Sequence, residues 1–284
     1  MNLRRLTPSD LQSDVFDHST IPPFNECILC ISIICKVKNN FKDLKMSTKE
    51  TNIIFGLHSS LAAVLNKRRK IKKIVCTDEV FKRNKTLLNN LVNIEKNILN
   101  RKQIDLLTGE KIHQGIVVYC ENLPKSEITD IGKNEKIVVI LDSLNDSQNV
   151  GSIIRTAHAF GVETIIYSKF NSFEINPFLI KSASGAFEKV KLIEVTNLNK
   201  TVNLLKTRKF WIVGLDHKSK IDINTVPHDI KKALILGSEN KGIKRLLLEN
   251  CDFRISINIK KSEFVDSLNV SNSAAIALFK FSER

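Results

Sequence analysis

Apolar residues in the second half of the chain form short runs that alternate with stretches of helical spacing. The runs predict strands at residues 137–141, 164–167, 190–195, 210–214, 233–236 and 253–257. The stretches between them predict helices at residues 151–160, 177–182, 198–206 and 243–249, and a last helix over about 269–281. Strands that alternate with helices favour a mostly parallel sheet covered on both faces. The sequence therefore predicts an α/β domain over residues 136–284.

The preceding part of the chain alternates in the same way over a shorter length. Strands are predicted at residues 53–55, 71–76 and 116–120, a short extended piece at 104–106, and helices at 59–65 and 86–99. This pattern predicts a small α/β domain over residues 46–122. Residues 123–135 carry Pro124 and Gly132 and are predicted to be a linker.

The first 45 residues differ from the rest of the chain. They lack convincing periodicity, contain Pro22 and Pro23, and hold three of the six cysteines. We expect residues 1–45 to be a disordered or non-native extension, with Met46 as the actual start. Recovery of a tryptic peptide from residues 6–36 of the native protein would contradict this expectation.

The charge balance indicates a polyanionic partner. The formal net charge is +14, and residues 47–122 hold 14 Lys or Arg against 7 Asp or Glu. Nucleic acid is the commonest partner of such a surface, although a merely solvated basic face is the alternative. The densest cluster lies between a predicted helix and a predicted strand, where a loop could present it to RNA phosphates. It comprises Lys67, Arg68, Arg69, Lys70, Lys72 and Lys73.

Several functional classes are disfavoured by composition. No apolar run approaches the ~20 residues that a membrane-spanning helix needs, so a soluble cytoplasmic protein is expected. Cys27 and Cys30 form a C-x-x-C pair, but no second pair stands at zinc spacing, so no metal site is predicted. The sequence contains no phosphate-binding P-loop, no G-x-G-x-x-G after the first strand of the large domain, and no G-x-S-x-G.

Three polar stretches follow predicted strands of the large domain, at residues 142–155, 236–243 and 267–279. Each alone is compatible with ordinary turns and helix caps. Because the carboxyl ends of parallel strands share one edge of a sheet, the three together predict a single site.

These stretches resemble the three motifs of the SpoU (TrmH-type) RNA 2′-O-ribose methyltransferases of the SPOUT superfamily. The residues that carry the resemblance are Asn149, Gly151 and Arg155, then Gly237, Glu239, Gly242 and Ile243, and finally Ser267, Leu268, Asn269, Val270 and Ser271. The stretches around residues 54–65 and 113–118 resemble the small RNA-binding domain that precedes the catalytic domain in many members. Ser147 stands where the family usually has proline, and the usual Ile-Pro-Met before the third motif becomes either Ile257-Asn258-Ile259 or Ile259-Lys260-Lys261.

The resemblance implies a deep trefoil knot, S-adenosylmethionine as methyl donor, and a homodimer. It places Gly237, Leu268 and Ile257 or Ile259 in the donor pocket, and Arg155, Asn149, Glu239, Ser267 and Asn269 at the catalytic centre. A guanidinium stays protonated in proteins, which argues against Arg155 as a base. We expect Arg155 to clamp a phosphate and to stabilise the developing alkoxide, while the other four orient the loops and the ribose hydroxyl.

The leading hypothesis is methylation of a guanosine 2′-hydroxyl in large-subunit (23S) ribosomal RNA. A transfer RNA ribose methyltransferase of the same family is the second reading. A catalytically silent RNA-binding assembly factor on the same scaffold is the third, kept open by the altered segment before the third motif.

Overall fold

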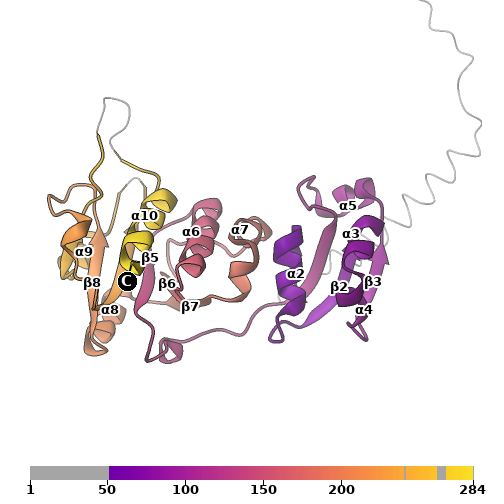
Figure 1. Ribbon diagram of the computed structural model, residues 1–284, viewed down its shortest axis with the longest axis horizontal. Helices are drawn as coiled ribbons and strands as arrows, with labels where there is room; N and C mark the ends of the chain where they lie inside the picture. Colours follow the sequence, from indigo (N-terminus) through magenta and orange to yellow (C-terminus); the bar gives the residue numbers. More distant parts are fainter. Residues whose placement is uncertain (1–50, 240, 261–266, 284) are drawn as a thin grey trace, which may run out of the picture. The chain divides into compact units, whose positions relative to one another are not determined.

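The computed structural model describes residues 51–239, 241–260 and 267–283 of the chain (Figure 1). Residues 1–50 lie outside the described part of the chain. The expectation that residues 1–45 are a disordered or non-native extension therefore concerns residues that the structure does not describe.

The N-terminal part of the described chain forms a four-stranded mixed sheet in the order β1-β4-β2-β3. Its strands are β1 (Thr51–Phe55), β2 (Ile71–Cys76), β3 (Glu95–Ile98) and β4 (Ile116–Glu121), and its helices are α2 (Leu57–Leu65), α3 (Asp78–Arg83), α4 (Lys85–Asn89) and α5 (Arg101–Thr108). Strand β4 runs antiparallel to β1 and β2, whereas β2 and β3 run parallel.

Two predicted elements of this small domain are wrong. The helix predicted over residues 86–99 ends at Asn89, and Asn93, with φ of 65°, turns the chain into β3, which pairs with β2. The piece predicted as extended at residues 104–106 lies inside α5. A capping box starts this helix, because the Asn100 side chain accepts from the Gln103 N–H while the Gln103 side chain accepts from the Asn100 N–H.

The C-terminal part forms a six-stranded sheet in the order β10-β8-β9-β5-β6-β7, with parallel pairing throughout. Its strands are β5 (Ile137–Asp142), β6 (Thr164–Ser168), β7 (Lys191–Val195), β8 (Phe210–Leu215), β9 (Lys231–Gly237) and β10 (Phe253–Ile255). The predicted parallel sheet is confirmed, and β5 and β9 lie side by side at its centre.

Helices cover both faces of this sheet, as the alternation of buried residues along β5 requires. Val139 and Leu141 face α6 (Ser147–Ala159), α7 (Pro177–Ala183) and α10 (Val270–Ser282), whereas Val138 and Ile140 face α8 (Leu198–Thr207) and α9 (Arg245–Glu249). Short 3-10 turns lie at Ile128–Asp130, Ser184–Glu188 and Ile223–Thr225, labelled η1, η2 and η3. The trefoil knot that the resemblance implies stays a prediction.

The small domain packs on the large one through α2, which contacts η2 closely. A Cβ built on Gly185 would lie 3.1 Å from the Ala62 Cβ, so α2 and η2 approach each other closely there. The contact also contains a buried ion pair, in which Arg69 Nη2 lies 2.5 Å from Glu188 Oε1 and both side chains are 1% exposed. The Ser59 hydroxyl donates to the Ile180 carbonyl at 3.0 Å.

Candidate functional site

The carboxyl ends of β5 and β9 are joined by a buried carboxylate. Asp142 Oδ2 accepts a hydrogen bond from the Lys244 backbone N–H at 2.7 Å, and Oδ1 lies 3.3 Å from Lys244 Nζ. The Ser143 hydroxyl donates to the same carboxylate at 3.1 Å. Asp142 is fully buried, so these charge-assisted contacts satisfy it and fix the loop after β9 against the end of β5.

That loop turns back on itself directly after Gly237. The N–H groups of Ser238 and Gly242 each donate to the other residue's carbonyl, at 3.1 and 2.8 Å. A Cβ on Gly237 would lie 2.2 Å from the Gly242 carbonyl carbon and from the Ile243 nitrogen, which is closer than real contacts allow. Position 237 therefore requires glycine because two backbone segments meet there.

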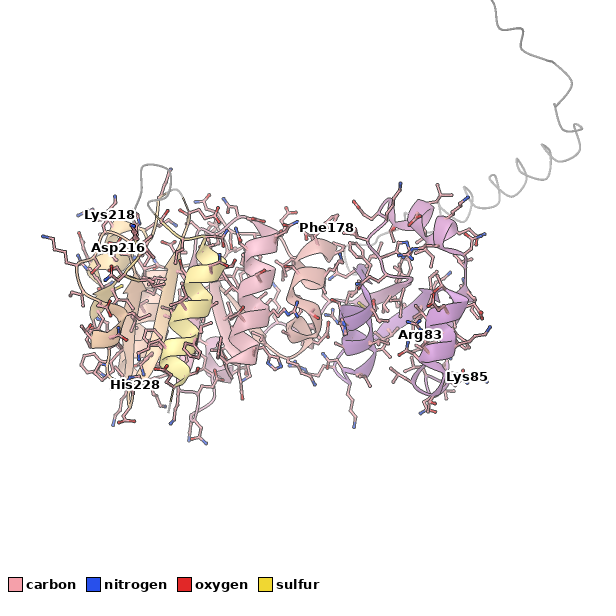
Figure 2. The ribbon with its side chains drawn as sticks, turned by 45° about the horizontal axis from the view of Figure 1, so that its top comes forward. Arg83, Lys85, Phe178, Asp216, Lys218 and His228 are labelled. Carbon is pink, nitrogen blue, oxygen red and sulfur yellow. The ribbon has the colours of Figure 1, made fainter. Side chains whose placement is uncertain are left out.

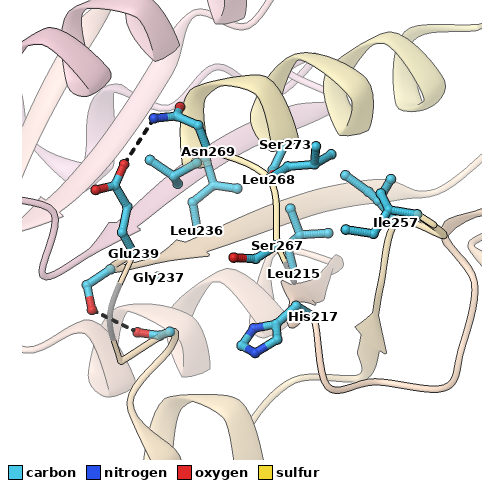
Figure 3. A pocket seen from close by; sticks show the side chains of 14 residues that line it. Leu215, His217, Leu236, Gly237, Glu239, Ile257, Ser267, Leu268, Asn269 and Ser273 are labelled. Atoms are coloured by element: carbon cyan, nitrogen blue, oxygen red, sulfur yellow. Dashed lines mark hydrogen bonds between the residues drawn. The ribbon is translucent and has the colours of Figure 1, made fainter. Parts of the chain in front are cut away.

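A polar cluster stands beside this loop, with one residue from each of the three stretches that the sequence singled out. Asn149 Nδ2 donates to Glu239 Oε1 at 2.6 Å and to Asp146 Oδ2 at 2.9 Å. Asn269 Nδ2 lies 3.1 Å from both Asn149 Oδ1 and Glu239 Oε1. Figure 3 shows Asn269 directed at Glu239 from the start of α10. Sequence reasoning predicted that the stretches converge, and Asn149, Glu239 and Asn269 do meet.

The cluster borders a pocket of about 450 Å³ at the same edge of the sheet (Figure 3). All four predicted donor contacts line it: Gly237, Ile257, Ile259 and Leu268. Glu239, Ser267 and Asn269 line it too. Both alternatives for the altered segment, Ile257 and Ile259, thus face one cavity.

Sequence reasoning missed Leu215 and His217, which also line this pocket at the end of β8. Strand β8 neighbours β9, so its carboxyl end reaches the same edge. The polar residues that follow the predicted strand 210–214 were the available signal.

Arg155 does not line this pocket. It lines a second pocket of about 390 Å³ with residues of α6 and α7 and with Ile112. The two helices approach closely there, because a Cβ on Gly151 would lie 2.5 Å from the Ser182 Cβ. Arg155 is exposed, and its side chain makes no ion pair or hydrogen bond with other residues in the described part of the chain.

Side-chain hydrogen bonds fix the start of α6, where Ser147 stands in place of the proline that is usual in the family. The Asp146 side chain accepts from the Gln148 N–H at 2.8 Å and caps the helix. The Ser147 hydroxyl accepts a hydrogen bond from Asn176 Nδ2 at 3.0 Å, and Asn176 is itself the cap of α7. Ser147 therefore ties the beginnings of the two helices together.

The basic cluster is only partly available to RNA. Lys67 and Arg68 are exposed, and Lys70 and Lys72 lie 3.5 and 3.6 Å from the half-buried carboxylate of Glu121. Lys73 pairs with Glu95 at 2.8 Å, and its hydrogen bond is the main cause that lowers the pKa of that carboxyl.

The position of Arg69 does not fit the prediction that it contacts RNA. Its guanidinium donates to Glu188 and, at 2.9 Å, to the Glu121 carbonyl, and the residue is 5% exposed. A buried guanidinium with these partners does not reach a phosphate, so Arg69 is not an RNA contact.

The described residues include neither a membrane-spanning helix nor a cluster of metal ligands. No helix among them is long and apolar enough to cross a membrane. No three His, Cys, Asp or Glu side chains among them gather as metal ligands would. The Cys27–Cys30 pair lies outside the described residues.

Comparison with protein families gives two matches. Residues 136–279 match the SpoU rRNA Methylase family, and residues 53–126 match the RNA 2′-O ribose methyltransferase substrate binding family.

Similar proteins include the 23S rRNA (guanosine-2′-O-)-methyltransferase RlmB of Coxiella burnetii. It is 34% identical over 237 residues, which cover 80% of this chain and 93% of that protein. A putative TrmH family tRNA/rRNA methyltransferase of Staphylococcus aureus is 31% identical over 240 residues, or 81% of this chain and 95% of that protein. The crystal structure of an AdoMet-bound rRNA methyltransferase from Sinorhizobium meliloti has the same fold, with a TM-score of 0.70 and 21% identity. The similarity extends over 88% of this chain and 93% of the Sinorhizobium meliloti chain.

Proposed function

The chain belongs to the SpoU family of RNA 2′-O-ribose methyltransferases, and from this we propose that it methylates a guanosine 2′-hydroxyl in large-subunit ribosomal RNA with S-adenosylmethionine as donor. One observation carries the proposal. The pocket lined by Gly237, Ile257, Ile259 and Leu268 borders the hydrogen-bonded cluster of Asn149, Glu239 and Asn269. A donor pocket beside groups that can hold a hydroxyl is what methyl transfer to ribose needs.

The residues of the pocket fit the proposed donor. Leu215, Leu236, Ile257 and Leu268 supply apolar walls, while Gly237 and Gly242 bring backbone polar groups to the lining of the pocket. S-adenosylmethionine supplies a methyl group on a positively charged sulfur. The carboxylate of Glu239 lines the pocket and favours a cation.

The polar cluster orients the acceptor. Asn149 and Asn269 hold the Glu239 carboxylate in place, so that it can accept a hydrogen bond from the ribose 2′-hydroxyl. Ser267 supplies a further hydroxyl at the rim of the same pocket. Because the 2′-hydroxyl is a weak nucleophile, its orientation toward the methyl group contributes a large part of the rate.

Arg155 acts on the RNA phosphate rather than on the donor. Guanidinium groups stay protonated in proteins, which argues against a role for Arg155 as acceptor of the hydroxyl proton. Its place beside the second pocket, on the same helix as Asn149, suits a phosphate clamp that stabilises charge as the alkoxide develops.

A homodimer and a cytoplasmic location complete the proposal. Helix α10 exposes Ile276 and Phe279, which are 40% and 56% exposed, and the Phe279 ring lies 6.1 Å from that of Phe160 at the end of α6. This apolar face is suited to a second copy. The described cysteines Cys76, Cys120 and Cys251 are free thiols, which suits a reducing compartment.

Methyl transfer from labelled S-adenosylmethionine to unmodified bulk RNA tests the proposal. Label on a ribose in the large ribosomal fraction is expected, whereas label in transfer RNA would overturn the ribosomal substrate and keep the chemistry. If no RNA is labelled, donor binding is measured by calorimetry. Binding indicates an enzyme whose RNA substrate was not present in the right state, whereas no binding indicates a catalytically silent RNA-binding assembly factor.

Arg155→Ala tests the phosphate clamp. We expect the variant to fold and to bind donor like the wild type, and to lose turnover. Unchanged turnover would remove Arg155 from the mechanism.

A further inference from the structure

The second pocket, beside α6 and α7, combines cations with exposed apolar side chains. Arg155 comes from α6, Phe178 and Lys181 come from α7, and Ile112 comes from the small domain. Its volume of about 390 Å³ lies at the lower end of the ~300–1,000 Å³ typical of ligand pockets.

Its two cations lack acidic partners. Within the part of the chain that the structure describes, neither Arg155 nor Lys181 makes an ion pair, and no Asp or Glu lines the pocket. In contrast, Lys70, Lys72 and Lys73 of the basic cluster each lie within 3.6 Å of a carboxylate. Two uncompensated cations at one cavity favour an anion such as a phosphate.

The apolar part of the pocket suits a nucleobase. Phe178, labelled in Figure 2, is 38% exposed, and its ring meets Phe55 edge-on at 5.5 Å between centroids and 84° between planes. The Phe55 contact fixes the ring and occupies only part of it. Ile112, 41% exposed, adds a second apolar surface. Aromatic rings of this kind are the usual stacking partners of unpaired bases.

Helix α6 relates this pocket to the methyl-transfer site. Asn149 belongs to the cluster with Glu239, whereas Gln148, Ser152 and Arg155, at i, i+4 and i+7, line the second pocket. Neighbouring helix positions differ by about 100°, so the two sets occupy adjacent flanks of one helix. An RNA chain whose ribose lies at Asn149 needs only about one nucleotide to reach the second pocket.

We propose that this pocket binds the unpaired nucleotide next to the methylated one, with its phosphate between Arg155 and Lys181 and its base against Phe178. The inference rests on the proposed function, since it names where that site holds its RNA. Ile112 makes the small domain part of the nucleotide site. The polar side chains of Gln148 and Ser152 lie where they can meet the base edge.

Equilibrium binding to transcribed large ribosomal RNA tests the pocket independently of catalysis. Phe178→Leu keeps apolar contact with Phe55 and removes the aromatic face, and we expect RNA affinity about tenfold lower. Lys181→Gln keeps most of the stem, and we expect the slope of log affinity against log salt to fall by about 1. The matched controls are Phe170→Leu and Lys169→Gln, both on exposed residues outside the pocket, and they should behave like the wild type.

Several results decide the inference. Donor affinity and the midpoint of thermal unfolding should be unchanged in the variants, which excludes misfolding. If Phe178→Leu and Lys181→Gln bind the transcript like their controls, the pocket is not a nucleotide site, whether or not methyl transfer occurs. If the wild type binds the transcript through this pocket but methylates no RNA, the proposed function fails and the pocket stands.

Once the methylated position is mapped, an abasic ribose at its neighbour provides the positional test. It should weaken wild-type binding by the same factor as Phe178→Leu and should leave that variant's affinity unchanged. Equal losses for the wild type and the variant would show that the base does not stack on Phe178.

Discussion

The buried pair of Arg69 and Glu188 makes a quantitative prediction. In Glu188→Gln the side chain keeps its shape, but the Arg69 guanidinium loses its counter-charge in a place where both side chains are 1% exposed. The carboxylate accepts two bonds from Arg69, at 2.5 and 3.2 Å, and one from Asn66 Nδ2 at 2.7 Å. The variant leaves Arg69 as a buried, unpaired charge.

The expected cost is about 3–5 kcal/mol in the free energy of unfolding, the usual range when one partner of a buried pair is removed. For a domain of this size each kcal/mol lowers the unfolding midpoint by about 2–4 °C, so a drop of about 6–20 °C is expected. Differential scanning calorimetry measures it. Removing both charges, in Arg69→Met with Glu188→Leu, should cost less than Glu188→Gln alone, because no charge is then stranded.

The control is an exposed pair, Arg245 and Glu249, with side chains 81% and 48% exposed. Glu249→Gln should cost less than about 1 kcal/mol. A loss of similar size for Glu188→Gln would refute the buried-pair argument. At a temperature where the Arg69→Met, Glu188→Leu variant is folded, its salt dependence of RNA binding should equal that of the wild type, since Arg69 does not face phosphate.

Three further predictions concern the donor pocket, the outer face of α10 and the thiols. Gly237→Ala should reduce donor affinity at least tenfold by calorimetry, because its Cβ would lie 2.2 Å from the Gly242 carbonyl carbon and displace the loop; wild-type affinity would contradict the close approach. Phe279→Asp should convert a dimer to a monomer in sedimentation analysis, since the ring is 56% exposed on the proposed dimer face; an unchanged mass would exclude that face. Burial raises the pKa of Cys76 to about 11 and that of Cys251 to about 12, so at pH 8 few thiolates form. Peptide mapping should find both thiols unalkylated by iodoacetamide in the native protein and alkylated in urea; native labelling would contradict their burial.

The large domain could be predicted because its strands are continuous apolar runs. Residues 137–141 and 233–236 were expected as strands and form the centre of the sheet as β5 and β9. In the small domain the same reasoning fails at β3, whose residues Glu95, Lys96 and Asn97 carry no apolar alternation. Its extended form comes from parallel pairing with β2, a tertiary contact that local pattern does not encode.

The candidate site could likewise be predicted from the sequence only in part. That Asn149, Glu239 and Asn269 would meet follows from the position of their loops at one edge of a parallel sheet. That Arg155 faces a different pocket follows from helix phase and from α7, which the sequence does not position. The run from Lys67 to Lys73 indicated a basic surface, but only the packing against Glu188 distinguishes buried Arg69 from its exposed neighbours.

Helix α6 carries both Asn149 and Arg155 and therefore fixes the spacing between them. One flank carries Asn149 and the adjacent flank carries Arg155, so in the proposed mechanism the rise of the helix sets the distance between the transferred methyl group and the RNA phosphate. A single residue inserted after Val150 would rotate Arg155 by about 100° relative to Asn149, while both side chains remained present. In that mechanism, the register of this one helix matters as much as the identity of the residues on it.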